Sequence, residues 1–172
     1  MNTQIKFSKE QWETLVVALR NEIEEFGALV NLLDEQQNRI LGRDPEGITE
    51  MNKTIDEQIA LCRDMRRVRE DVVTVLASGV NEHEEVSVRA LLSYFPEEVQ
   101  GLLQALSDEI FDLMEKTQRK AGQNQMLLVR AFEAVEQVVR ALCPELITKT
   151  YDKKGSISVK APSDGTCMKT SV

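Results

Sequence analysis

An unbroken helical pattern from Pro96 to Cys143 constrains this chain more than any other feature. Apolar, small or weakly polar residues recur there in steps of three and four, with a mean of about 3.6, the period of an α-helix. They are Val99, Leu103, Leu106, Ile110, Leu113, Thr117, Ala121, Asn124, Leu128, Phe132, Val135, Val139 and Leu142. Pro96 suits a first helical turn and Pro144 ends the pattern, because proline cannot donate a backbone hydrogen bond. The pattern predicts one long helix that needs partners to cover its apolar stripe.

The middle of this stripe is its least apolar part. Thr117, Ala121 and Asn124 are small or polar, and Gly122 lies beside them. Two interpretations remain open. The helix is either packed tightly or hydrogen-bonded across the seam at this point, or it is locally weakened at Gly122.

Composition favours helices and limits the class of partner. The 172 residues are enough for one domain with a continuous core, and only 5% are aromatic. The formal net charge of −8 argues against a nucleic-acid or anionic-membrane binder, because such a surface repels the acidic chain. We find neither a signal peptide nor a membrane span, and the three cysteines have no CxxC spacing. These features predict a cytoplasmic protein.

Two further helices precede the long one and should form an antiparallel hairpin. Ser8 and Gln11 have the spacing of a capping box, which predicts a helix start at Ser8. Gly42 is placed as a C-terminal cap, and Asp44 followed by Pro45 is a helix start. The second helix should end at Ser78 and Gly79.

Charges along the predicted hairpin give a register. If the turn centres near Arg43 and Asp44, Glu22 lies opposite Arg66 and Glu25 opposite Arg63. The sequence therefore predicts two ion pairs between exposed side chains. The arginines of the second helix could instead form a basic docking patch.

The fold class that follows is all-α. We expect an antiparallel bundle of three long helices with a short crossover helix, capped by Ser87, and a mobile C-terminal tail. Residues 1–146 would be the helical domain and residues 147–172 the flexible tail. The tail, ITKTY then DKKG then SISVK, also fits a β-hairpin, but two strands alone are marginally stable in water.

No catalytic or cofactor chemistry stands out. His83 is the only histidine, which removes the usual catalytic triads and the histidine ligands of di-iron bundles. The glycines are dispersed and form no phosphate-binding loop. We expect no enzyme activity, no cofactor and no metal.

The long helix exceeds the other two, so about a dozen residues should extend beyond them. Phe132, Val135, Val138, Val139 and Leu142 fall in that extension. An uncovered apolar stripe usually marks a partner site, and an amphipathic helix of another protein could cover it. A homodimer would cover the same surface.

The order of these elements and several local sequences resemble the FlgN-type flagellar type III export chaperones. The resemblance covers EIEEFGALVNLLDEQQNRIL, GRDPEGI, IDEQIALCRDMRRVREDV, KAGQNQMLLVRAFEAVEQVVRAL and TYDKKGSI. Its more specific part is Asn124, Gln125, Leu127 and Leu128, followed by Tyr151, Asp152 and Gly155.

The resemblance implies a helical, non-enzymatic chaperone. The resemblance also implies that the chain binds the C-terminal amphipathic segments of hook-filament junction proteins through its own C-terminal part. It further implies that Tyr151 helps to present the loaded chaperone to the flagellar export gate or ATPase complex. The partner-binding residues are then Asn124, Leu128, Phe132, Val135, Val139, Leu142 and Tyr151. The alternative is a homodimeric coiled-coil scaffold or adaptor protein.

Overall fold

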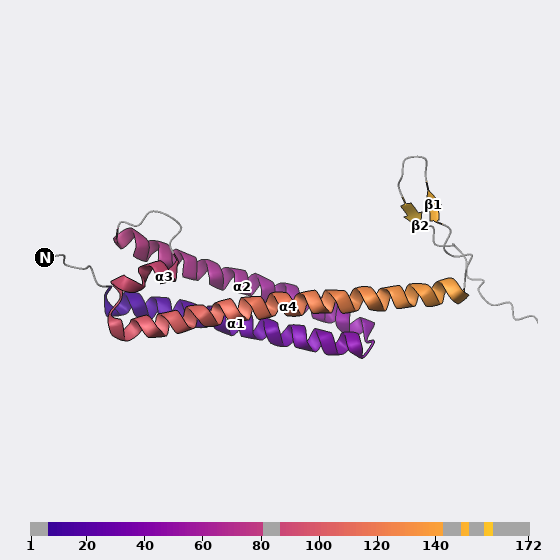
Figure 1. Cartoon of the computed structure of the whole chain (residues 1–172), viewed down its shortest axis with the longest axis horizontal. Coiled ribbons are helices and arrows are strands. Elements are labelled where there is room, and N and C mark those ends of the chain that lie inside the picture. The colour runs from indigo at the N-terminus through magenta and orange to yellow at the C-terminus, as the bar shows by residue number, and fades with distance from the viewer. Residues whose placement is uncertain (1–6, 81–86, 143–148, 152–156, 160–172) are drawn as a thin grey trace, which may run out of the picture. The chain divides into compact units, whose positions relative to one another are not determined.

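The computed structural model describes residues 7–80, 87–142, 149–151 and 157–159. The elements are α1 (Lys9–Leu41), α2 (Pro45–Gly79), α3 (Val88–Leu91), the 3-10 helix η1 (Leu92–Tyr94), α4 (Glu97–Leu142), β1 (Lys149–Tyr151) and β2 (Ile157–Val159). The chain divides into two compact units, Met1–Asn124 and Gln125–Val172, and the boundary falls inside α4. In the first unit, α1, α2 and the first part of α4 run side by side (Figure 1). The predicted all-α bundle of three long helices with a short crossover is confirmed.

Helix α1 begins where the capping box predicts. Ser8 Oγ accepts a hydrogen bond from the Gln11 backbone N–H at 3.3 Å, and Gln11 Oε1 accepts one from the Ser8 N–H at 2.8 Å. The preceding residue, Phe7, is buried, and its N–H donates to the Tyr94 carbonyl at 3.1 Å. Its ring lies 4.6 Å from that of Phe95. The start of α1 is thereby fastened to the crossover that leads into α4.

The turn between α1 and α2 depends on contacts around Asp44. Asp44 Oδ1 accepts a hydrogen bond from the Gly47 N–H at 3.0 Å, which confirms Asp44 as the N-cap. Arg39 reaches the other carboxylate oxygen at 3.2 Å. A Cβ on Gly47 would lie 2.1 Å from Asp44 Oδ2 and 2.3 Å from Arg39 Nη1, so both side-chain ends would have to move to admit one. Gly42 is the C-cap, as expected, but the positive φ of the turn, 56°, belongs to Arg43.

The hairpin register agrees with the sequence, but the predicted ion pairs are wrong. Gln36 Nε2 donates to Asn52 Oδ1 at 2.8 Å, which puts these residues level as expected. Glu22, however, is bound by Arg69 and not by Arg66, with an Nε–Oε2 distance of 2.5 Å. Arg69 lies less than one turn beyond Arg66, on the side of α2 that faces the interior, and the carboxylate it meets is fully buried.

The second predicted pair is also replaced. Gln58, rather than Arg63, meets Glu25, and its Nε2 donates to Glu25 Oε2 at 2.5 Å. Arg66 pairs instead with Glu70 on its own helix at 2.9 Å. Side chains four residues apart on one helix are neighbours whatever the second helix does. This local pair therefore competes with the predicted pair between the two helices.

Two buried clusters stabilise the first unit. The larger one joins α1, α2, the crossover and the first half of α4, and includes Leu15, Leu19, Leu76, Leu91, Phe95, Leu103 and Ile110. The smaller one consists of α1 and α2 residues only, namely Leu29, Leu33, Met51, Ile55 and Cys62. Helix α4 therefore shares a large apolar core with the hairpin only near its own beginning.

The described part of the tail is a two-stranded antiparallel sheet. Strands β1 and β2 pair Lys149 with Val159 and Tyr151 with Ile157. This is the β-hairpin that the sequence also allowed, whereas the predicted mobility stays a prediction. The predicted domain boundary at residues 146 and 147 lies outside the described residues. None of the described helices is both long enough and apolar enough to cross a membrane.

Candidate partner-binding surface

The seam between α4 and the hairpin changes from apolar to polar along α4. Leu103 and Ile110 are buried in the large cluster, but Leu113 and Thr117 are only half-buried. Farther on, Lys120 forms an ion pair with Asp34 of α1. The attachment of α4 to this part of the hairpin is therefore made by polar groups.

Asn124 makes the most buried of these polar contacts. Its side chain is 2% exposed, and its Nδ2 donates to the Leu33 carbonyl and to Gln36 Oε1, both at 2.8 Å. Because Gln36 in turn donates to Asn52, a chain of amides joins α4, α1 and α2. This confirms the hydrogen-bonded interpretation of the seam. Helix α4 runs unbroken through Gly122.

The same face of α4 becomes exposed in the second unit. Successive side chains at helical spacing remain apolar there, but Phe132 is 70% exposed and Leu142 76%. The other exposed apolar residues of this segment are Met126, Val129, Val135, Val138 and Val139, and Leu128 is half-buried. We call Leu128, Phe132, Val135, Val139 and Leu142 the distal stripe. A contiguous stripe of this size is typical of an interaction site.

The formal charges around the distal stripe cancel. Arg130, Glu133, Glu136 and Arg140 are the charged residues between positions 125 and 142. Arg140 pairs with Glu136, four residues earlier on the same helix. Contact with a partner at this segment would therefore depend mainly on apolar burial.

The predicted partner-binding residues do not all lie together. Five of them form the distal stripe, whereas Asn124 lies in the interior of the first unit. In this structure Asn124 fastens α4 to α1, and its predicted contact with a partner stays a prediction. Tyr151 ends strand β1, with its backbone paired to Ile157, and its side chain lies outside what the structure describes.

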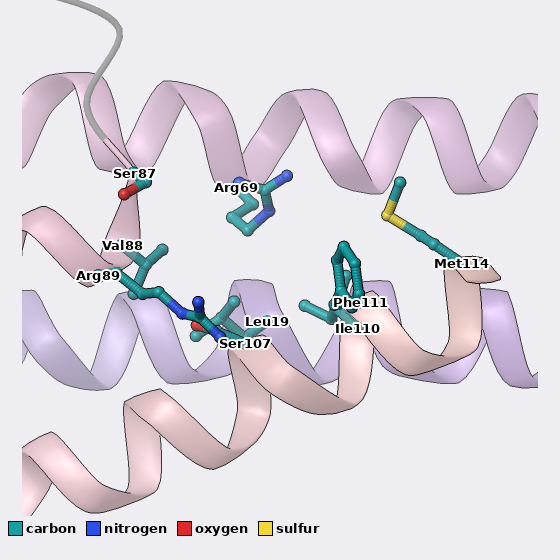
Figure 2. A pocket seen from close by; sticks show the side chains of 9 residues that line it. All are labelled: Leu19, Arg69, Ser87, Val88, Arg89, Ser107, Ile110, Phe111 and Met114. Atoms are coloured by element: carbon teal, nitrogen blue, oxygen red, sulfur yellow. The ribbon is translucent and has the colours of Figure 1, made fainter.

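Sequence reasoning missed two features of α4. Met126 and Val129 are exposed in the same segment of α4 but outside the distal stripe, and the dense run MLLV was the signal that could have pointed to them. The other feature is a cavity of about 340 Å³ in the first unit. Its lining residues are Leu19, Arg69, Ser87, Val88, Arg89, Ser107, Ile110, Phe111 and Met114 (Figure 2). Phe111 lies off the core ladder, so the periodicity gave it no role.

The pKa values of Asp108 and Cys62 are shifted, each for a clear physical reason. The pKa of Asp108 is lowered by its hydrogen bond from Arg89, a residue of the cavity lining, and by a second one from Gln104. Burial raises the pKa of the Cys62 thiol to about 11. A thiol with that pKa is almost entirely protonated at neutral pH and is a poor nucleophile.

Comparison with known protein families gives a match over most of the chain. Residues 11–158 match the model of a protein family described as FlgN protein. No curated protein and no solved structure matches the chain. The matched range begins in the first turn of α1 and includes the rest of α1, all of α2, the crossover, α4, strand β1 and most of strand β2.

Proposed function

Because the chain belongs to the FlgN family of flagellar export chaperones, we propose that its cargo is the hook-filament junction proteins, which it carries through the cytoplasm to the type III export apparatus. The family match confirms the resemblance on which the sequence interpretation rested. The cargo, the delivery step and the cytoplasmic location are our proposal, which the described surface supports. The chain would act by binding alone.

The observation that carries this proposal is the distal stripe of α4. Its five residues follow one another in steps of four and three, which is the spacing at which one amphipathic helix contacts another. Two of them, Phe132 and Leu142, are among the most exposed apolar side chains of the chain. The amphipathic C-terminal segment of a junction protein would bury them in the complex.

Tyr151 has a separate role in this proposal. It follows α4 and lies on β1, within the part of the chain that carries the resemblance. We assign it to the contact with the export gate or ATPase complex. The small sheet would then fold over or beside the bound cargo helix.

Truncation of the distal stripe tests the cargo site. A buried Phe or Leu anchor contributes about 1.5–3 kcal/mol, so Phe132→Ala or Leu142→Ala should weaken cargo binding roughly 10- to 150-fold. Titration calorimetry with the C-terminal segment of a junction protein measures this effect. The matched control is Leu41→Ala, an exposed leucine of α1, which should leave affinity unchanged. Helix content should be the same in all three variants.

Tyr151→Ala tests the delivery step. Export of junction proteins should fall while affinity for the isolated cargo segment stays near that of the unmodified chain. If Phe132→Ala and Leu142→Ala both bind cargo with the affinity of the unmodified chain, the distal stripe is not the cargo site. Loss of cargo affinity in Tyr151→Ala would make the tyrosine a cargo contact.

A homodimeric scaffold is the second candidate, because a second copy would cover the same exposed stripe. Sedimentation equilibrium of the chain without cargo separates the two functions. A stable dimer that Phe132→Ala dissociates, together with no binding of junction-protein segments, would favour the scaffold.

A further inference from the structure

Helix α2 carries a second apolar stripe on its outer side, apart from the residues that it buries against α1. Five apolar residues follow one another there in steps of four and three, which is the spacing of a helix–helix contact. We call them the α2 stripe: Leu61, Met65, Val68, Val72 and Val75. Leu61 and Val68 are each 45% exposed and Val75 is 71% exposed, whereas the other two are half-buried.

The three exposed residues of the α2 stripe belong to neither buried cluster. By the helical period of 100° per residue, Val68 lies about 120° around α2 from Cys62 and about 140° from Val73, one residue of each cluster. Val72, at the inner edge of the stripe, packs against the larger cluster. The stripe is therefore an outer extension of the core, and it runs for about 21 Å along the helix.

An acidic row borders the α2 stripe on its outer side. The row consists of Glu57, Asp64 and Asp71, each of which lies four positions before an exposed residue of the stripe. Side chains four residues apart on a helix are neighbours, so every carboxylate of the row adjoins the stripe. All three are exposed, and within residues 7–80 and 87–142 none of them has an ion-pair partner.

The arginines of α2 are either already paired or lie beyond the acidic row. Arg66 and Arg69 are each paired with a glutamate. Arg67 and Arg63 lie about 100° and 140° around the helix from Val68, on the far side of the row, and form no ion pair with it in the described part of the chain. The carboxylates next to the stripe are therefore free to bind cations of a partner.

Helix α1 adds a carboxylate where the α2 stripe begins. Gln58, three residues before Leu61, donates its hydrogen bond to Glu25 Oε2 at 2.5 Å. A neutral amide leaves the negative charge of Glu25 in place. The border of the stripe is thus acidic on both helices of the hairpin.

We propose that the α2 stripe is a second docking surface, which accepts a basic amphipathic helix of a partner protein. Apolar side chains of that helix pack on Leu61, Val68 and Val75, and lysine or arginine side chains that recur every seven residues meet the acidic row. The net charge of −8 attracts such a helix from a distance. The α2 stripe shares no residue with the distal stripe, so this partner would not compete for the cargo site.

The acidic row disfavours a second copy of this chain as the occupant. In an antiparallel pair of α2 helices the two acidic rows would face each other, and like charges across an interface repel. In a parallel pair each row would face Met65 and Val72 of the other copy, which carry no charge. A basic helix forms ion pairs at the same positions.

The probe for this surface is a synthetic amphipathic peptide of leucine and lysine, added to the full chain. Methyl resonances of Leu61, Val68 and Val75 should shift on binding. Leu61→Ala and Val68→Ala together should weaken binding about 5- to 30-fold, because both side chains are partly exposed in the free chain and buried in the complex. A peptide with glutamate in place of lysine should fail to bind.

A second variant removes the charges of the acidic row and leaves the α2 stripe intact. It combines Glu57→Gln, Asp64→Asn and Asp71→Asn. It should weaken binding about three- to tenfold and reduce its dependence on salt. The matched control neutralises three exposed carboxylates of α4, and so changes the net charge equally. It combines Glu109→Gln, Asp112→Asn and Glu115→Gln. Peptide affinity should stay nearly unchanged in this control.

Val129→Ala and Leu142→Ala together are the control for the apolar contact, because they truncate the same two residue types at exposed positions of α4. They should leave peptide affinity unchanged. Unaltered affinity in the Leu61 and Val68 variant, equal weakening in the α4 charge control, or equal binding of the glutamate peptide would each overturn the proposal. Self-association of the chain that depends on Leu61 and Val68 would also overturn it, by making a second copy the occupant.

Discussion

The buried ion pair between Glu22 and Arg69 makes the sharpest prediction about stability. The Glu22 side chain is 0% exposed, and Arg69 holds it with Nε–Oε2 and Nη2–Oε1 distances of 2.5 and 3.5 Å. In Arg69→Met the carboxylate would remain buried without a counter-charge. Such a change costs about 3–5 kcal/mol, a large part of the roughly 5–15 kcal/mol by which a domain is stable.

The matched control removes an exposed pair on the same helix. Arg66 pairs with Glu70 at 2.9 Å, and both side chains are about half exposed. Arg66→Met should therefore change the free energy of unfolding by no more than about 0.5 kcal/mol. Replacing both buried partners, with Glu22→Leu and Arg69→Met together, should restore most of the lost stability, because no charge is then left in the interior.

Urea unfolding followed by circular dichroism measures all three effects. The dependence of the unfolding free energy on urea concentration should stay constant, so that midpoints can be compared directly. The reasoning is refuted if Arg69→Met costs no more than Arg66→Met. It is also refuted if the double variant is as unstable as Arg69→Met alone, because the stability lost in Arg69→Met could then not come from the unpaired Glu22 carboxylate.

Asn124→Ala should loosen α4 from Leu113 to Asn124, because it removes the two bonds to α1 while leaving the large cluster intact. We expect the free energy of protection against hydrogen exchange to fall by about 1–2 kcal/mol over that segment. The control is Gln125→Ala, an exposed residue of the same helix, which should change nothing. Equal protection in the two variants would contradict the role of Asn124. For Cys62, folding raises the thiol pKa from 9.0 to about 11, so stability should be constant below about pH 9 and fall as the pH rises towards 11. The measurement uses a variant in which Cys143 and Cys167 are replaced by serine, so that Cys62 is its one thiol. A thiol reagent should react with Cys62 far more slowly in the folded than in the unfolded protein. Equal rates would show that Cys62 is not buried.

Helix ends and the distal stripe could be predicted because their signals are local. Ser8 with Gln11 and Asp44 with Pro45 each fix a helix start within a few residues of sequence. The exposure of Phe132 and Leu142 followed from the length of α4 relative to the hairpin. These properties depend on local capping residues, helical periodicity and helix length.

Side-chain partners could not be predicted, because they depend on how two helices face each other. Glu22 was assigned to the arginine level with it, but burial selected Arg69, which lies less than one turn farther along α2. Asn124 was expected to be either packed or bonded, and only the structure identifies Leu33 and Gln36 as its acceptors. The pocket beside Phe111 was missed for the same reason, since three helices and the crossover contribute to it.

The separation of the two buried clusters affects the order in which the chain can fold. The smaller cluster joins residues on either side of one tight turn, so closing it costs little loop entropy. The larger one requires Leu15 to meet Leu103, and it cannot form until most of the chain has left the ribosome. The closed end of the hairpin should therefore assemble first during synthesis, with α4 docking last. Until that docking, the apolar side chains of the open end would be exposed to other chains and prone to aggregation.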